Sequence, residues 1–259
     1  MLKAPAAPSI AGCVALVTGA NRGIGKGFVE ELLAAGANRV YAAARSLESL
    51  ESLTALDSMR VVPLDIDVTR VDLILRAARR AKDVQLLINN AGIAGEAGQR
   101  RLIGAPNLDD ARVVMDTDFW GQLEMCRAFA PLLAENGGGA IVNILSVGSL
   151  FSLPEFGSYS VAKWAARAMG MAIRAELYQQ GTLVANVYPA GVESDMSKNT
   201  PGPKLTAREH ARQVLAALAQ GQEEIFPGDA GEKFRDPIAR DPAAFEREVR
   251  ARFLNSPLG

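Results

Sequence analysis

A serine, a tyrosine and a lysine stand at a spacing that could move a proton to or from an oxygen atom. Tyr159 follows Ser146 by thirteen residues and precedes Lys163 by four. On a helix, side chains four positions apart project from the same face. An ammonium near a phenol favours phenolate, so this pair could donate and accept protons nearer neutral pH than free tyrosine. Ser146 ends an apolar run and could hydrogen-bond a carbonyl or hydroxyl oxygen beside the tyrosine.

Each of these residues also has a structural interpretation. Tyr159 could be a half-buried helix tyrosine, Lys163 a solvated lysine, and Ser146 a polar residue at a strand end. The spacing of all three behind a glycine-rich turn favours the catalytic interpretation over the structural one.

The glycine-rich turn lies between a strand-like run, Val14–Val17, and a helical segment, Lys26–Ala35. Its candidate ligand-binding residues are Gly19, Asn21, Arg22, Gly23, Ile24 and Gly25. A strand, a glycine turn and a helix in this order bring helix N-terminal N–H groups to a dinucleotide pyrophosphate. The alternative is a glycine-rich turn without a ligand, and the flanking strand and helix weigh against it.

Apolar runs of strand length alternate with segments of helical spacing. The other strand-like runs are Arg39–Ala43, Arg60–Pro63, Leu86–Ile88, Ala140–Leu145 and Leu183–Val187, with a seventh around Glu224–Phe226. The other helical segments are Asp72–Ala81, Asp109–Glu135, Ser158–Gln180 and Thr206–Gln220. This rhythm predicts an α/β fold, a Rossmann-type doubly wound parallel sheet of about seven strands with helices on both faces. We expect a single domain at residues 12–259, preceded by a flexible arm at residues 1–11.

Composition narrows the class of protein. With 49% hydrophobic and 22% charged residues among 259, the chain is typical of a soluble globular protein. A net charge of -1 gives no electrostatic reason to bind nucleic acid or an anionic membrane. The single histidine, His210, excludes most zinc and Ser-His-Asp sites, and Cys13 and Cys126 lie in apolar segments. We expect buried thiols, no metal, no membrane span, no signal peptide and a cytoplasmic location.

These motifs resemble the short-chain dehydrogenase/reductase family, roughly from Cys13 to Phe226. The glycine turn has that family's Gly-x-x-x-Gly-x-Gly spacing. The resemblance implies hydride transfer between a nicotinamide cofactor and a carbonyl or alcohol, with Tyr159 as general acid and base. It also implies that Ser146 hydrogen-bonds the substrate oxygen and that Lys163 lowers the tyrosine pKa and binds the ribose hydroxyls.

Three further segments match cofactor-binding motifs of the family. The residues implied are Asn90, Ala91 and Gly92 near the adenosine ribose, Asp67 and Val68 at the adenine, and Pro189, Gly191, Val192 and Ser194 at the nicotinamide amide. Ala190 replaces a family glycine in the last segment. At the adenine, a register slip of two residues to Asp65 stays open.

Two arginines point to the phosphorylated cofactor. Twenty residues past Gly25 a dinucleotide site carries an acid for the ribose, or an arginine for a 2′-phosphate. Here the second strand ends at Arg45 with no acid before it, and Arg22 adds a second cation. A guanidinium suits a phosphate by charge and geometry, so NADP(H) is favoured over NAD(H). The alternative is that both arginines are simply solvated.

One position departs from the family pattern. In the family, an asparagine holds a water that connects the lysine to solvent, and Asp118 stands where that asparagine is expected. A carboxylate can accept a hydrogen bond from water but lacks the amide donor. Its charge favours protonated Lys163 and opposes phenolate formation. We hypothesise that Asp118 keeps the relay with an altered pH optimum.

The substrate is less constrained by the sequence. The pocket loops are expected at Ile93–Gly104, Val147–Phe156 and Val192–Thr206, the last acting as a lid at about 192–206. The second loop is apolar, which favours an uncharged or aromatic carbonyl compound, with core packing of the same residues as the alternative. Arg100 and Arg101 could bind an anionic substrate or form a solvated loop face.

The tail Asp241–Phe253 has helical spacing, and its apolar residues could pack on the body or on a neighbour. Family members are commonly dimers or tetramers built on the helices bearing Asp118 and Tyr159, so the resemblance implies a homodimer or homotetramer.

Two functions of different class follow. The first is an NADP(H)-dependent carbonyl reductase or alcohol dehydrogenase. The second is a nucleotide-binding regulatory or scaffold protein of the same fold without turnover. An intact Ser146, Tyr159 and Lys163 favours the first, and Asp118 alone supports the second.

Overall fold

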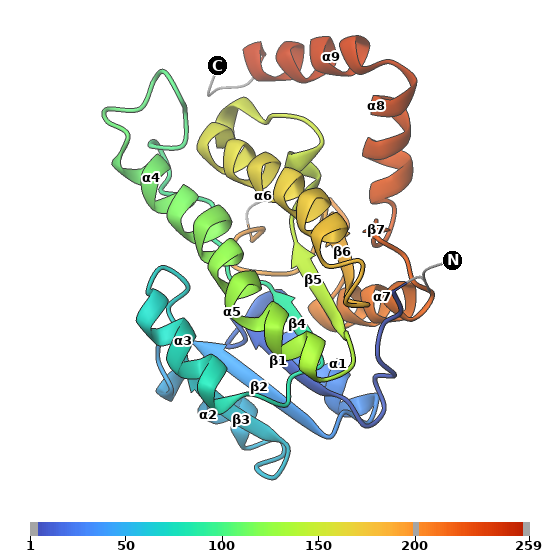
Figure 1. Cartoon of the computed structure of the whole chain (residues 1–259). Helices are drawn as coiled ribbons and strands as arrows, with labels where there is room; N and C mark the ends of the chain where they lie inside the picture. The colour runs from blue at the N-terminus through green and yellow to red at the C-terminus, as the bar shows by residue number, and fades with distance from the viewer. Residues whose placement is uncertain (1–4, 199–201, 256–259) are drawn as a thin grey trace.

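The computed structural model describes residues 5–198 and 202–255, and it contains a parallel sheet covered by helices on both faces (Figure 1). The remaining residues of the expected arm, lid and C-terminus lie outside the described residues. The strands are β1 (Val14–Thr18), β2 (Arg39–Ala44), β3 (Val61–Asp65), β4 (Leu86–Asn89), β5 (Ala140–Ile144), β6 (Leu183–Val187) and β7 (Glu224–Ile225). Their spatial order is β3-β2-β1-β4-β5-β6-β7, and all pairs are parallel. This order confirms the single doubly wound, Rossmann-type fold. It also places the point where the strand order reverses between β1 and β4, where such folds bind ligands.

Each face of the sheet has its own apolar core. One face packs against α1 (Gly23–Ala34), α2 (Glu51–Thr54) and α7 (Ala207–Ala219). The other packs against α3 (Val71–Arg80), α5 (Gln122–Glu135) and α6 (Gly157–Glu176), and α4 (Asp109–Met115) leads into α5. Because residues of a strand alternate between faces, neighbours such as Ala15 and Leu16 belong to opposite cores. Cys13 and Cys126 are free and buried, as the sequence predicts.

Several element boundaries differ from the expected ones by one to four residues, and two of these differences have a clear physical reason. The third strand runs to Asp65 and includes Pro63, although proline cannot donate a ladder hydrogen bond. Because β3 is an edge strand, the missing N–H costs nothing there. The first helix begins at Gly23, three residues before the expected start at Lys26, so two glycines of the turn lie inside its first turn.

The C-terminal residues form two helices that arch over the N-terminal end of α6 (Figure 1). These are α8 (Asp236–Arg240), which the sequence did not predict, and α9 (Pro242–Leu254). The Asp241 side chain caps α9 by accepting a hydrogen bond from the Ala244 N–H at 2.9 Å. The Phe245 ring meets Phe151 at 4.9 Å between centroids. The predicted tail helix therefore packs on the body.

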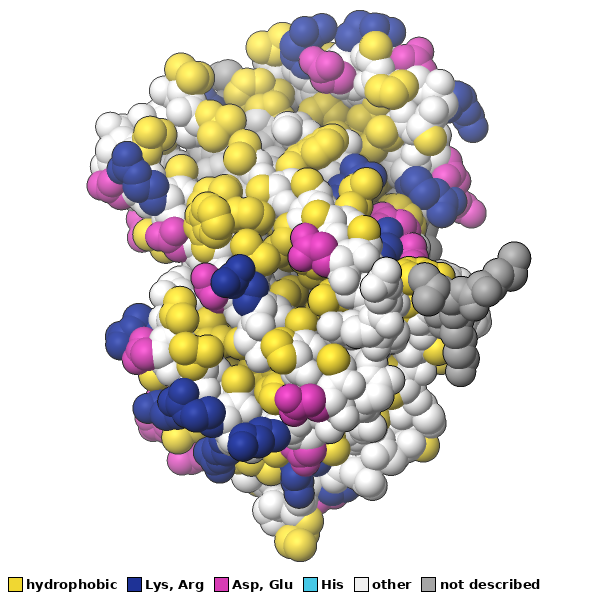
Figure 2. Space-filling view, viewed as in Figure 1, with side chains coloured by type: hydrophobic (Ala, Val, Ile, Leu, Met, Phe, Trp, Pro, Cys, Tyr) yellow, Lys and Arg dark blue, Asp and Glu magenta, His cyan; other side chains and the backbone are white. Residues whose placement is uncertain are grey.

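The face that carries α4, α5 and α6 keeps large apolar side chains at the surface (Figure 2). Val113 and Trp120 come from the α4–α5 helix, and Val161 and Trp164 come from α6. Their exposed fractions lie between 42% and 52%. Because α4 and α6 pack together, these four side chains belong to neighbouring helices on one side of the molecule.

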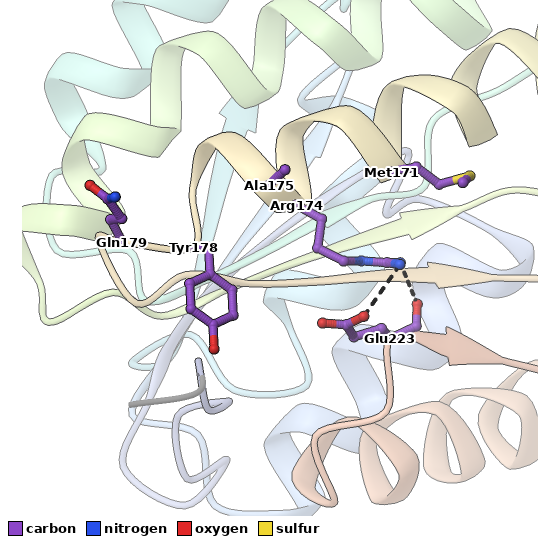
Figure 3. A pocket seen from close by; sticks show the side chains of 6 residues that line it. All are labelled: Met171, Arg174, Ala175, Tyr178, Gln179 and Glu223. Atoms are coloured by element: carbon purple, nitrogen blue, oxygen red, sulfur yellow. Dashed lines mark hydrogen bonds and ion pairs between the residues drawn. The ribbon is translucent and has the colours of Figure 1, made fainter. Parts of the chain in front are cut away.

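The far end of α6 fastens the short edge strand to the sheet (Figure 3). The Arg174 guanidinium donates to the carbonyl oxygens of Val184 and Glu223, and it forms an ion pair with Glu224 at 2.6 Å. A hollow of about 440 Å³ lies beside it, lined by Met171, Arg174, Ala175, Tyr178, Gln179 and Glu223. Since Tyr159 lies in the first turn of the same helix, this hollow is at the opposite end from the candidate catalytic residues.

The described part of the expected N-terminal arm lies on the body of the fold. Ala7 and Ile10 pack against the core between the sheet and α1, and the Gly12 N–H donates to the Gly36 carbonyl at 2.9 Å. Across residues 5–198 and 202–255, no helix is both long and apolar enough to cross a membrane.

Candidate active site

The glycine turn is held by side chains from the ends of two neighbouring strands. The Asn90 side-chain amide donates to the carbonyl oxygens of Thr18 and Gly19, at 2.8 and 3.1 Å. In return, the Thr18 hydroxyl accepts from the backbone N–H groups of Asn90 and Ala91. The Asn-Asn-Ala-Gly segment after β4 therefore sets the position of the turn after β1, at the reversal in strand order.

The start of α1 has the features of an anion-binding site. Gly19 and Gly23 have φ angles of 62° and 51°, the left-handed region that favours glycine. A Cβ at Gly25 would overlap the Gly19 carbonyl oxygen and lie 2.6 Å from the Asn90 amide. No side chain among the described residues caps this helix, and its first turn carries no acid. Its first N–H groups thus remain available to a phosphate, which fits the pyrophosphate of a dinucleotide.

The three candidate catalytic residues converge where β5 ends and α6 begins. Ser146 follows the last residues of β5, and its hydroxyl accepts the Gly148 N–H at 3.0 Å. A Cβ at Gly148 would lie 3.4 Å from the Ser146 hydroxyl and 3.8 Å from the Tyr159 ring, so both residues border the same small space. The Lys163 ammonium lies 5.6 Å from the centre of the Tyr159 ring. The structure thus brings together the three residues that the sequence singled out.

Asp118 joins this set through a widened turn of helix. Between α4 and α5 the helix forms a π turn over Asp116–Gly121, a distortion that recurs at functional sites. The turn buries Asp118 completely and places its carboxylate 3.1 Å from the Lys163 ammonium. The other carboxylate oxygen accepts the Ile93 N–H at 2.8 Å. Asp118 is therefore in direct contact with the lysine, without the intervening water expected of the family's asparagine.

The ion pair is enclosed on its remaining sides. The Lys163 ammonium also donates to the Ile144 carbonyl oxygen at 3.1 Å. Gly92 lies across the pair, because a Cβ at that position would be 3.2 to 3.3 Å from the Asp118 oxygens and the Lys163 nitrogen. Four segments, the β4 loop, the π turn, β5 and α6, thus meet at one buried pair of charges.

Burial and charge both act on the proton affinity of these groups. Desolvation raises the pKa of Tyr159, and the Asp118 charge raises it further, while Lys163 and Ser146 act in the opposite direction. The pKa of Lys163 is raised, because attraction to Asp118 and Tyr159 outweighs its desolvation. Desolvation raises the pKa of Asp118 against the lowering effect of Lys163 and of the Ile93 N–H.

Comparison with known proteins agrees with this geometry. The short chain dehydrogenase family matches residues 13–204. The chain belongs to this family. A crystal structure of a short chain dehydrogenase from Burkholderia cenocepacia J2315 in complex with NADP superposes with a TM-score of 0.86 at 41% identity, covering 93% of this chain and 99% of that one.

Curated relatives of this short-chain dehydrogenase are oxidoreductases. An uncharacterized oxidoreductase of Myxococcus xanthus is 30% identical over 82% of this chain and 87% of its own length. A 3-oxoacyl-[acyl-carrier-protein] reductase of Synechocystis is 29% identical over 89% of this chain and 90% of its own length. The chain is therefore an oxidoreductase of the short-chain dehydrogenase family.

The two arginines predicted to bind a 2′-phosphate lie in different surroundings. In this short-chain dehydrogenase the Arg22 guanidinium forms an ion pair with Asp195 at 2.8 Å, and both side chains are about two-thirds exposed, at 68% and 70%. Arg45 is exposed, and within residues 5–198 and 202–255 it forms neither a hydrogen bond nor an ion pair. Arg45 is free to meet a phosphate, whereas Arg22 would have to share or leave Asp195.

The residues predicted to lie at the adenine include two carboxylates, which have different partners. Asp65 forms an ion pair with Arg76 at 2.8 Å. Asp67 accepts hydrogen bonds from the N–H and hydroxyl of Thr69, at 2.9 and 2.7 Å, and so closes its own turn. Val68 packs against Gly121 of the π turn, which links the adenine-side loop to the turn that carries Asp118. Which carboxylate meets the adenine stays a prediction.

The segment from Pro189 to Ser194 connects β5 to the glycine turn. The Val147 N–H donates to the Pro189 carbonyl at 3.0 Å, and the Leu205 N–H donates to the Gly191 carbonyl at 2.9 Å. Val192 pairs with Leu205 in an isolated bridge. Ser194 lies against Gly23, since a Cβ at Gly23 would be 3.3 Å from the Ser194 Cβ. Part of the predicted lid, residues 199–201, lies outside the described residues.

Some site contacts were not predicted from the sequence. The backbone groups of Ile93 and Ile144 that hold the ion pair have no side-chain signal. Asp195 lies 173 residues from Arg22, and nothing in the sequence spacing links them. A row of buried asparagines, Asn89, Asn143 and Asn186, crosses β4, β5 and β6 in register, and their side chains hydrogen-bond one another at 3.1 and 3.3 Å. The signal for this row was present, because a buried asparagine in an apolar strand needs a partner.

Proposed function

We propose that this short-chain dehydrogenase reduces carbonyl compounds with NADPH and oxidises the corresponding secondary alcohols with NADP+. The observation that carries the proposal is the convergence of Ser146, Tyr159 and Lys163 at the end of β5. That convergence lies beside a glycine turn whose uncapped helix suits a dinucleotide. The printed names of the relatives support the reaction class.

The side chains supply the proton chemistry. A bound nicotinamide cofactor supplies the hydride in reduction and accepts it in oxidation. As the carbonyl oxygen gains charge, the Tyr159 hydroxyl donates its proton to it, and the Ser146 hydroxyl donates a hydrogen bond to the same oxygen. In oxidation, the Tyr159 phenolate takes the alcohol proton. Lys163, following the family pattern, holds the cofactor ribose.

Arg45 favours the phosphorylated cofactor. Its exposed guanidinium follows the last residue of β2, where a dinucleotide fold places the adenosine ribose, and no acid precedes it there. The NADP in the Burkholderia structure supports the same choice. The residues proposed to hold the cofactor are Gly19, Asn21, Arg22, Gly23, Ile24, Gly25, Arg45, Asp67, Val68, Asn90, Ala91, Gly92, Pro189, Gly191, Val192 and Ser194, with Tyr159 and Lys163 at the ribose.

The substrate is proposed to be an uncharged ketone or aldehyde. The Arg100 guanidinium lies over the Phe156 ring at 4.6 Å and donates to the Gly95 carbonyl. Arg101 lies over the Phe253 ring at 5.2 Å. The sequence left open whether these two cations bind an anion or are solvated. In the fold both lie over aromatic rings, one in the β5–α6 loop and one in α9. Phe151, in the same loop, lies between rings of the C-terminal segment. The aromatic surroundings favour an apolar substrate.

We also propose that copies of the chain associate through the helices bearing Asp118 and Tyr159. The exposed side chains of Val113, Trp120, Val161 and Trp164 on that face support this, because contiguous exposed apolar surface marks interaction sites. Light scattering of the wild type and of Trp120→Glu would test it, with a smaller particle expected for the variant.

A spectrophotometric screen of NADPH oxidation against ketones, aldehydes and imines tests the proposed function. Turnover is expected with at least one apolar ketone or aldehyde. The Tyr159→Phe variant should lose about 10²- to 10⁴-fold in kcat while still binding NADPH, because the donated proton is removed and the rest of the proposed cofactor site is kept. NADPH binding without any turnover would instead favour the regulatory or scaffold alternative.

A further inference from the structure

We propose that Asp118 is a positioning residue that cancels the charge of Lys163 and so keeps Tyr159 in its proton-donating form. The inference rests on the proposed function and assigns a preferred direction to it. Reduction of carbonyls should therefore stay efficient as the pH becomes alkaline. Oxidation of alcohols should become efficient only at alkaline pH.

The direct contact between Asp118 and Lys163 is the observation that carries this proposal. Its side chain is completely buried, and its carboxylate lies 3.1 Å from the ammonium of Lys163, whose side chain is 5% exposed. In a buried site, charges at this separation interact far more strongly than in water. Gly92 and the Ile93 N–H close the carboxylate in from the β4 side. The pair is therefore in direct contact, since a separation of 3.1 Å leaves no room for a water between the two charges.

The consequence for Tyr159 follows from the sign of each neighbouring charge. An unopposed ammonium near the phenol would stabilise phenolate, whereas an ammonium paired with a carboxylate presents almost no net charge to it. Within the described residues, the charged groups that reach Tyr159 are Lys163 on its own helix and Asp118 on the π turn. From β5 it meets the uncharged hydroxyl of Ser146. Among the residues described, Asp118 is thus the negative charge that opposes phenolate.

The two directions of the reaction depend on opposite forms of Tyr159. In reduction, a hydride from reduced cofactor forms the new C–H bond, the carbonyl π electrons move to oxygen, and the tyrosine proton completes the hydroxyl. The resulting phenolate regains a proton from solvent. In oxidation, the phenolate must exist before it can take the alcohol proton. Stabilising the protonated tyrosine therefore sustains the rate of reduction at high pH and shifts the onset of oxidation to higher pH.

Asp118→Asn tests the proposal, because it keeps the shape and the acceptor for the Ile93 N–H and removes only the charge. Asp116→Asn is the matched control, since Asp116 lies on the same π turn and is exposed. The first readout is the tyrosinate absorbance of the cofactor-free proteins as pH rises, with Tyr159→Phe variants subtracted. This readout needs no turnover, so it distinguishes failure of this inference from failure of the proposed function.

For wild type, the difference titration should place Tyr159 above the ordinary tyrosine value of 10. Asp118→Asn should lower that midpoint by about one to two pH units, and Asp116→Asn should leave it unchanged. The second readout is kcat/KM in each direction, where both the alkaline limb of reduction and the acid limb of oxidation should move down by the same amount. An unchanged midpoint in Asp118→Asn, or an equal shift in Asp116→Asn, would overturn the proposal. If Asp118→Asn does not fold, Asp118→Ser takes its place with the same expected downward shift, and an unchanged midpoint in that variant overturns the proposal.

Discussion

Two ion pairs of nearly equal length stand at the two ends of the candidate site, in opposite surroundings. Lys163 and Asp118 are 3.1 Å apart and buried, with exposed fractions of 5% and 0%. Arg22 and Asp195 are 2.8 Å apart, with exposed fractions of 68% and 70%. The first pair lies at the proposed proton-transfer end and the second at the start of α1, the helix proposed to bind the cofactor.

The difference shows why distance alone does not measure an ion pair. Solvent screens the exposed pair, so breaking it costs little, and Arg22 can exchange Asp195 for a phosphate. Separating the buried pair would leave an uncompensated charge inside the protein, which is costly. The proton-transfer end is therefore fixed before ligands arrive, whereas the cofactor end can rearrange around them.

Removing the cation of each ion pair, Lys163 or Arg22, tests the difference between the two pairs. Lys163→Met should lower the free energy of unfolding by about 3–5 kcal/mol, because it leaves the Asp118 carboxylate buried without its partner. Arg22→Met, the matched control, should change it by less than about 1 kcal/mol. Urea denaturation near neutral pH measures both. Part of the Lys163→Met loss should return as pH falls, since the raised pKa of Asp118 lets that carboxyl take a proton in the folded state.

A third buried group, His210, extends the comparison. Burial keeps its side chain uncharged, whereas Lys163 and Asp118 are buried as a charged pair. His210 on α7 is fully buried against Phe28 of α1, and desolvation lowers its pKa from 6.5 to about 4. The unfolded chain takes up its proton near pH 6.5 and the folded chain only near pH 4, so stability is lost as pH falls through that window. We expect a loss of about 2 kcal/mol between pH 7 and pH 5 from this group.

His210→Phe should remove that part of the acid dependence in denaturant titrations at both pH values. Wild type and variant with the same slope of stability against pH would contradict the assignment to His210.

Arg45 extends the comparison to an exposed cation that has no hydrogen-bond or ion-pair partner among the residues described. Arg45→Ala should weaken NADPH binding roughly tenfold and leave NADH binding unchanged, because only the 2′-phosphate contact is removed. Fluorescence titration of both cofactors measures the ratio. Arg79→Ala is the control, since that exposed arginine lies in the last turn of α3, which leads into the start of β4, at the opposite end of the strands from Arg45. Equal losses for NADPH and NADH would refute a phosphate contact.

The smallest effect is expected at Asp195. Asp195→Asn removes the competitor for Arg22 and should tighten NADPH binding by up to about threefold, within the range of one exposed ion pair. High salt should diminish the difference, since it screens exposed charges. Weaker NADPH binding in this variant would show that Asp195 assists the cofactor instead of competing for Arg22.

The fold and most of the site were predictable because local patterns encode them. Apolar strands alternating with helices specify the parallel sheet, and the i, i+4 spacing of Tyr159 and Lys163 specifies their shared face. The glycines after β1 mark a turn that only residues without a side chain can form. The helix starting at Gly23 instead of Lys26 is a small error, because the same glycines serve both the turn and the helix.

The contacts that the sequence could not supply join segments distant along the chain. The pairing of Arg22 with Asp195 depends on how the segment after β6 lies against α1. Asp118 was recognised as a departure, but its direct contact with Lys163 depends on the π turn, which has no sequence signal of its own. Arg100 and Arg101 were expected to bind an anionic substrate or to form a solvated loop face, because the cation–aromatic contacts to Phe156 and Phe253 require the folded loop and α9.

The π turn over Asp116–Gly121 also makes the site sensitive to chain length in one place. A π turn holds one residue more than the α-helical repeat of the flanking α4 and α5 would need. Deleting a single residue there would close the turn into a regular helix, leaving α4 and α5 nearly in their present orientation and displacing the side chains of the turn itself around the helix axis. The helix would keep its ends and nearly its full length, yet Asp118 would turn away from Lys163. A change of one residue in the length of this turn would therefore decide whether Asp118 and Lys163 form their ion pair.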